Sequence, residues 1–257
     1  MSIFVEGLQG SGKSTAVNIL SRKHPGMRVY REGDHSPVEL AWCAYVTEDT
    51  YRGILDKYTD LRRETEENSF RENDRTVICY TKIKNGSAEF YKDMERYEIY
   101  NGRLPLDEFK NILLHRYSAW DGSGGIFECS LFQNTVEELT LFRCLADDDI
   151  IEMYKNIAEV LKNKDVHILY IRTDDITANL DAVRKERSDE NGNEIWFDML
   201  CGYFDNSPYA MKHGVSGVKG LTEHLMHRQE LELRICREVF ADKYNIIVSK
   251  MYNESDI

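Results

Sequence analysis

The sequence has little proline and no closely spaced pair of cysteines. Proline accounts for 4 of its 257 residues and glycine for 16, which excludes collagen-like and low-complexity classes. None of its six cysteines belongs to a C-x-x-C pair of the kind that opens a zinc or redox site; they are Cys43, Cys79, Cys129, Cys144, Cys201 and Cys236. We therefore expect reduced, mostly buried thiols and a cytoplasmic protein.

Long apolar runs and an excess of positive charge are also missing. No run approaches the roughly 18 apolar residues that cross a bilayer, and the chain does not open with the basic and apolar regions of a signal peptide. Its 45 acidic residues outnumber the 33 basic ones, which gives a formal charge of −12. This balance argues against broad binding to nucleic acid or to a membrane, because both need a clustered cationic surface. A phosphorylated small molecule can still bind to a local cluster.

Short apolar runs alternate with amphipathic segments along the chain. The runs predict strands at 2–6, 27–31, 126–128, 166–171 and 245–249. The segments between them have helical spacing, as at 15–23 and 221–244. This alternation predicts an α/β fold, a doubly wound parallel sheet with helices on both faces.

Two segments interrupt the alternation. Residues 38–120, including ELAWCAYV at 39–46, are mainly helical in pattern and predict a helical insertion for substrate binding. Within it, Thr76–Ile83 fits a strand or a buried helical turn. Residues 184–222 predict a lid, because the stretch from 188 to 220 is polar and contains glycines. No linker separates these segments, so we expect one domain over residues 1–257.

The most specific motif is GLQGSGKS at residues 7–14, which matches G-x-x-x-x-G-K-[ST] completely. It follows a predicted strand and opens a predicted helix, the context in which such a loop cradles phosphate groups. Lys13 is expected to reach the β- and γ-phosphates, and the Ser14 hydroxyl to bind Mg²⁺. The residues predicted to bind the nucleotide are Gly7, Gly10, Ser11, Gly12, Lys13, Ser14 and Thr15.

Other motifs that would assign the loop to a known class of nucleotide-binding protein are absent. The guanine-specifying N-K-x-D does not occur, since Asp165 lies one place too early after Asn163 and Lys164. There is no apolar run that ends in Asp-Glu, as in motor ATPases, and no LSGGQ-like element. Small P-loop kinases remain.

The order of elements resembles the nucleoside and nucleotide kinases, especially the thymidylate kinase and deoxynucleoside kinase branch. FVEGLQGSGKST is similar to the E-G-x-x-G-x-G-K-[ST] opening of thymidylate kinases, with Gln9 where that family often has an acidic residue. YREG at 30–33 resembles the R-E-P-G segment that ends the second strand. The resemblance implies that Arg31 and Glu32 lie at the acceptor, with Glu32 as the base that faces a substrate hydroxyl.

Two further segments carry the resemblance. Glu128, Cys129 and Ser130 resemble the family's E-R-S or D-R-Y, which implies that Glu128 lies beside Mg²⁺ and the acceptor, while Cys129 replaces an arginine. DAVRKERSDENG resembles a lid that carries R-x-x-R, which implies that Arg184 and Arg187 close over the phosphates.

We therefore expect a P-loop kinase that transfers the γ-phosphoryl group of ATP, with Mg²⁺, to a nucleoside, a nucleotide or a similar small molecule. Lys13 and the two lid arginines serve the donor, and Glu32, Asp34 and Glu128 serve the acceptor and the metal. A hydroxyl acceptor needs a carboxylate base, whereas a phosphate acceptor favours Arg31. Two alternatives stay open: a small-alcohol or antibiotic kinase on the same fold, and a regulator that hydrolyses ATP slowly. The sequence leaves monomer and homodimer open.

Overall fold

A computed structural model describes residues 1–257, and the chain divides into two compact units. The first unit combines Met1–Val29 with Asp121–Ile257. The second unit is Tyr30–Trp120, and it nearly coincides with the insertion expected over 38–120.

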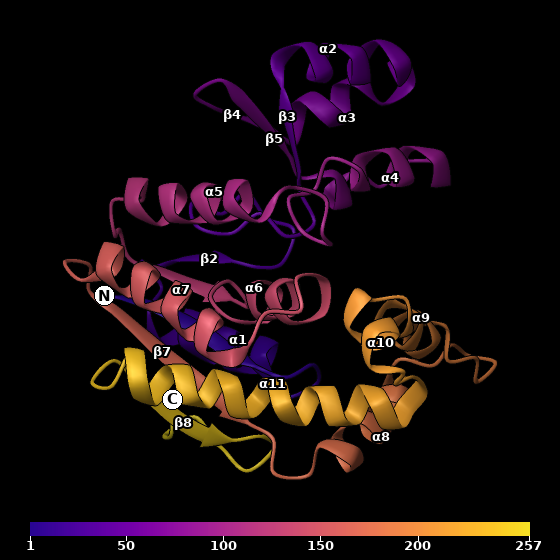
Figure 1. The fold of residues 1–257 in the computed structure, drawn as a ribbon. Helices are drawn as coiled ribbons and strands as arrows, with labels where there is room; N and C mark the ends of the chain where they lie inside the picture. The colour runs from indigo at the N-terminus through magenta and orange to yellow at the C-terminus, as the bar shows by residue number, and fades with distance from the viewer. The chain divides into compact units, whose positions relative to one another are not determined.

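A five-stranded parallel sheet forms the centre of the first unit (Figure 1). Its strands lie in the order β2-β6-β1-β7-β8. Their bounds are β1 Ser2–Gly7, β2 Arg28–Tyr30, β6 Gly125–Glu128, β7 Val166–Arg172 and β8 Tyr244–Val248. All six residues of β1 are buried, as expected for a central strand covered on both faces. The predicted α/β class and parallel sheet are confirmed.

Helices cover both faces of this sheet. In chain order they are α1 Lys13–Lys23, α6 Gln133–Glu137, the π-helical turn η3 Glu138–Phe142, α7 Asp147–Leu161, α8 Ile176–Glu186, α9 Ile195–Asp205, α10 Pro208–His213 and α11 Gly217–Val239. Residues of β7 alternate between the faces: Leu169 and Ile171 join the cluster under α1, whereas Tyr170 donates a hydrogen bond to Glu232 of α11. Helices α1 and α11 therefore lie on opposite faces of the sheet.

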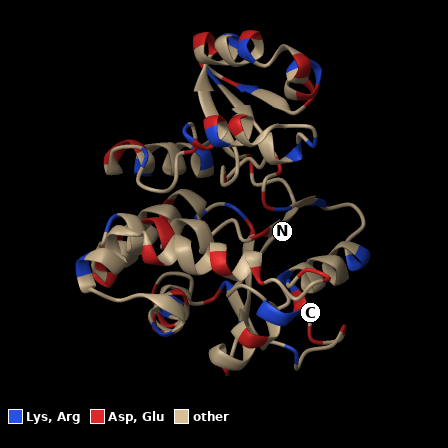
Figure 2. Cartoon of the chain, turned by 90° about the vertical axis from the view of Figure 1, so that its right-hand side faces the viewer, with Lys and Arg blue, Asp and Glu red and all other residues tan.

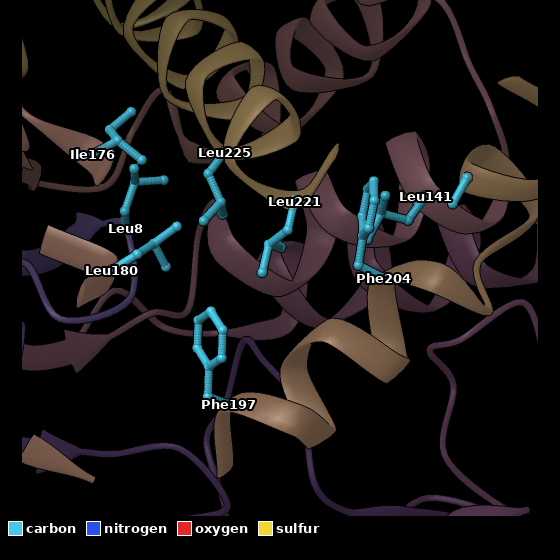
Figure 3. Close-up of a cluster of buried hydrophobic side chains, with 9 residues drawn as sticks. Leu8, Leu141, Ile176, Leu180, Phe197, Phe204, Leu221 and Leu225 are labelled. Atoms are coloured by element: carbon cyan, nitrogen blue, oxygen red, sulfur yellow. The ribbon is translucent and has the colours of Figure 1, made fainter. Parts of the chain in front are cut away.

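Residues 188–220, the polar and glycine-containing part of the predicted lid, contain helices α9 and α10 and the start of α11. Phe197, Phe204 and Leu221 from this segment join a buried cluster with Leu8 of the first loop and Leu180 of α8 (Figure 3). Apolar residues three or four apart in α9 provide the buried face, and Ser207 caps α10 by accepting from the Ala210 N–H. The segment is therefore largely helical, and its role as a lid stays a prediction.

The second unit is built around an antiparallel sheet of three strands in the order β3-β5-β4. The strands are β3 Ala44–Thr47, β4 Ser69–Glu72 and β5 Arg75–Ile78. The helices are α2 Glu48–Lys57, η1 Thr59–Leu61, α3 Arg62–Glu67, η2 Tyr80–Lys82, α4 Ala88–Glu95 and α5 Leu106–Ala119.

This sheet corrects two expectations for the insertion. ELAWCAYV was expected to be helical, but its last residues form β3, because Ala44 and Val46 pair with the β-forming residues Ile78 and Thr76. The undecided run Thr76–Ile83 is a strand followed by a 3₁₀ turn. The insertion is thus a mixed helix and sheet unit and not a purely helical one.

Charge is spread over both units, with Lys and Arg interspersed among Asp and Glu (Figure 2). None of the helices has the length and apolar character needed to cross a bilayer.

Candidate phosphate-binding site

The loop from Gly7 to Ser14 connects β1 to α1 through a tight turn that glycine makes possible. Gly10 has φ 74° and Gly12 has φ 98°, a region that favours glycine. A Cβ on Gly10 would lie 1.9 Å from Cγ2 of Val183, so α8 packs directly on the turn. A Cβ on Gly12 would lie 2.7 Å from the Tyr252 hydroxyl.

Lys13 folds back over this loop. Its Nζ donates hydrogen bonds of 2.8 Å to the carbonyl oxygens of both Gly7 and Leu8. Only 7% of the residue is exposed, so the side chain of Lys13 is buried and does not extend into solvent. These bonds hold the ammonium group against the loop, where it is able to contact an anion that binds there.

Other loop carbonyls are held by side chains from distant segments. At 2.8–2.9 Å, Gln9 O accepts from Asn179, Ser11 O from Ser249 and Gly12 O from Tyr252. In contrast, several N–H groups of the loop make no hydrogen bond within the protein, among them those of Gly10, Gly12, Lys13 and Ser14. Most carbonyls of the loop are thus bonded to the protein, whereas these N–H donors are available to an anion.

Glu128, which the resemblance places beside Mg²⁺ and the acceptor, lies next to the loop. Strands β6 and β1 are parallel neighbours with Glu128 opposite Val5, so both strands end at the same edge of the sheet. The Ser14 hydroxyl donates a 2.5 Å hydrogen bond to Glu128 Oε1. Cys129, which follows, takes φ 59° and turns the chain away from the strand.

This pair of oxygen ligands fits Mg²⁺. The ion is usually held by one or two protein oxygens together with phosphate oxygens and water. No group of three or more His, Cys, Asp or Glu side chains is arranged to bind a metal ion by itself. Ser14 and Glu128 would therefore hold the ion together with the phosphates of a bound nucleotide.

Behind the loop lies a buried carboxyl group that the sequence analysis missed. Glu6 of β1 is fully buried and accepts a 2.7 Å hydrogen bond from the Leu131 N–H. Burial raises its pKa to about 8, and the nearby Glu232 adds to this effect, while the Leu131 N–H and Lys13 oppose it. An acidic residue inside an otherwise apolar strand was the sequence signal for this group.

We expect stability to depend on the protonation of Glu6. Because the folded chain binds this proton more tightly than the unfolded chain, stability falls as pH rises from about 4.5 to about 8. Melting temperatures measured over that range should decline for the wild type. Glu6→Gln should remove part of this decline. A decline due to Glu39, whose burial raises its pKa to about 7, should remain in the variant. Identical pH profiles for the two proteins would contradict this assignment.

The predicted lid arginines contact the beginning of α9. Arg184 forms an ion pair with Glu194, and its guanidinium lies 5.1 Å from the Phe197 ring centroid. Arg187 lies 4.2 Å from the centroid of Trp196. Their closure over phosphates stays a prediction.

The predicted acceptor residues Arg31, Glu32 and Asp34 belong to the second unit. Asp34 accepts a 2.7 Å hydrogen bond from the Arg31 N–H and forms a 2.7 Å ion pair with Lys82. The carboxylate of Asp34 thus stabilises its own turn, and the acceptor role of all three residues stays a prediction.

Trp42 lies next to this turn in an unusual conformation. Its φ of 62° is strained for a bulky residue, at a cost of about 1 kcal/mol or more. A Cβ on Gly33 would lie 3.8 Å from Trp42 Cβ, so the two positions are adjacent. Yet 49% of the tryptophan is exposed, so burial of the ring offsets only part of the free-energy cost of this strain.

No protein-family model matches the sequence, and no curated protein matches it.

Proposed function

We propose that the protein is a P-loop kinase that transfers the γ-phosphoryl group of ATP to a small acceptor. The observation that carries the proposal is the loop at residues 7–14, most of whose carbonyls are bonded by the protein while N–H groups, including those of Gly10, Gly12, Lys13 and Ser14, remain for an anion. Helix α1 begins at Lys13, so its positive dipole end adds to these donors. The six free thiols support a reducing, cytoplasmic setting.

ATP and Mg²⁺ fit the residues present. The loop donors and the Lys13 ammonium would hold the β- and γ-phosphates, and Ser14 with Glu128 would hold the metal ion. When bound, Mg²⁺ neutralises charge on the phosphate oxygens. Arg187 follows Asn179 and Val183 of α8 at intervals of four residues, and both of these contact the loop. This spacing supports a role for Arg187 near the phosphates.

We further propose that the acceptor carries an aromatic ring, as a nucleoside or nucleotide does. Trp42 supports this, because its strained backbone presents a half-exposed indole beside the turn that contains Glu32 and Asp34. Strain that burial does not explain is typical of functional residues.

We expect Trp42→Gly and Trp42→Leu to raise the KM for the acceptor at least about tenfold while leaving the KM for ATP unchanged, since stacking on an aromatic ring is lost in both. Glycine tolerates φ 62° without strain, so the glycine variant should melt no lower than the leucine variant. Steady-state kinetics and thermal melts measure both quantities. If the leucine variant is clearly the more stable and keeps the acceptor KM, Trp42 serves packing only.

The kinase proposal is tested by measuring ADP formed from ATP and Mg²⁺ in the presence of nucleosides, nucleoside monophosphates and small alcohols. We expect ADP formation to depend on a member of the nucleoside or nucleotide set. Turnover that depends only on an alcohol would assign the protein to the small-alcohol kinases. Slow turnover that no acceptor changes would contradict the kinase proposal and support an ATP-hydrolysing regulator.

A further inference from the structure

Two side chains from the segment after β8 are bonded to the phosphate loop. Ser249 Oγ donates a 2.9 Å hydrogen bond to the carbonyl oxygen of Ser11, and the Tyr252 hydroxyl donates a 2.8 Å bond to the carbonyl oxygen of Gly12. The Tyr252 ring is anchored, because it packs on the apolar cluster beneath α1. The two residues lie about 240 positions from the loop in the sequence, so no motif links them to it.

The geometry of the peptide unit connects these bonds to anion binding. A carbonyl oxygen and the N–H of the next residue belong to one rigid plane and point in opposite directions. Holding Ser11 O against Ser249 therefore aims the N–H of Gly12 into the loop, and holding Gly12 O against Tyr252 aims the N–H of Lys13. Both N–H groups are among those that the protein leaves without a partner.

We infer that Ser249 and Tyr252 are positioning residues, which fix two peptide planes of the phosphate loop so that their N–H groups meet a polyphosphate. This inference rests on the proposed function of the loop. Neither residue needs to touch the nucleotide. Ser249 is expected to matter more, since Ser11 O has no other donor, whereas Gly12 O also accepts from the Ala16 N–H of α1.

The inference separates polyphosphate binding from binding of the base. Two probes serve this purpose: ATP with Mg²⁺, and inorganic tripolyphosphate with Mg²⁺, which has no base or sugar. The variants are Ser249→Ala, Tyr252→Phe and their double mutant, with dissociation constants measured by calorimetry. Tyr244→Phe is the matched control, because it removes a hydroxyl from the preceding strand that has no hydrogen bond in the structure.

We expect Ser249→Ala to weaken both probes about fivefold, Tyr252→Phe about threefold and the double mutant at least about tenfold, as the loss of one neutral hydrogen bond each would give. Melting temperatures should stay close to that of the wild type, and Tyr244→Phe should bind normally. Equal affinities of wild type and double mutant would overturn the inference while leaving the proposed function intact. So would a loss of affinity for ATP alone, because it would mean contact with the base. If the wild type binds neither probe, the proposed function fails and the inference with it.

Discussion

Lys13→Met is expected to abolish phosphoryl transfer. The ammonium group is held by the carbonyls of Gly7 and Leu8, and under the proposed function it would meet the charge that develops on the transferred group. One preorganised charge in such a site commonly contributes on the order of 3 kcal/mol, so kcat should fall by at least about 100-fold. The rate of ADP formation at saturating ATP and acceptor measures this loss.

The same substitution also changes the buried surroundings of the loop. Methionine cannot donate to the two carbonyls, so we expect a somewhat lower melting temperature, and activity should be measured well below it. Lys185→Met is the matched control, because Lys185 is exposed on α8 and its ammonium has no partner. A folded Lys13→Met variant with wild-type turnover would contradict the proposed function.

The parts of the structure that the sequence predicted are those set by local pattern. The run Val166–Ile171 became β7, since a strand buried on both faces must be continuously apolar. The turn at residues 7–14 was predictable because the positive φ angles of Gly10 and Gly12 favour glycine, and both positions belong to one motif of eight residues. Glu128 was predictable because strand ends at one edge of a parallel sheet converge.

The parts that the sequence did not predict depend on contacts between distant residues. Pairing of β3 with β5 converts ELAWCAYV from a helical pattern into a strand, because Ala44 and Val46 are buried only when the partner strand is present. Helix α9 was hidden by Gly202 and by polar neighbours, yet Phe197 and Phe204 belong to a buried cluster with residues from five other segments. Asn179 reaches the loop from α8, 170 positions away along the chain.

A second large effect is expected at Glu128. The Glu128→Gln variant keeps the shape of the side chain and an oxygen that can accept from the Ser14 hydroxyl, so it removes the charge while preserving this contact. The carboxylate is 8% exposed and lies against Ser14, where it would act on the metal ion and the acceptor. Its loss should therefore lower kcat by on the order of 100-fold, with little change in the KM for ATP, because the interaction is made mainly in the transition state.

Measurements of Mg²⁺ dependence make this prediction specific. The variant should need a higher Mg²⁺ concentration for half-maximal rate, since one of its two protein ligands has lost its charge. Glu98→Gln is the matched control, because Glu98 is also buried, and its 2.5 Å hydrogen bond from the Tyr80 hydroxyl can be kept by glutamine. That control should retain the Mg²⁺ dependence of the wild type. If Glu128→Gln instead raises the KM for ATP and leaves kcat unchanged, Glu128 acts in nucleotide binding and another group must serve the transition state.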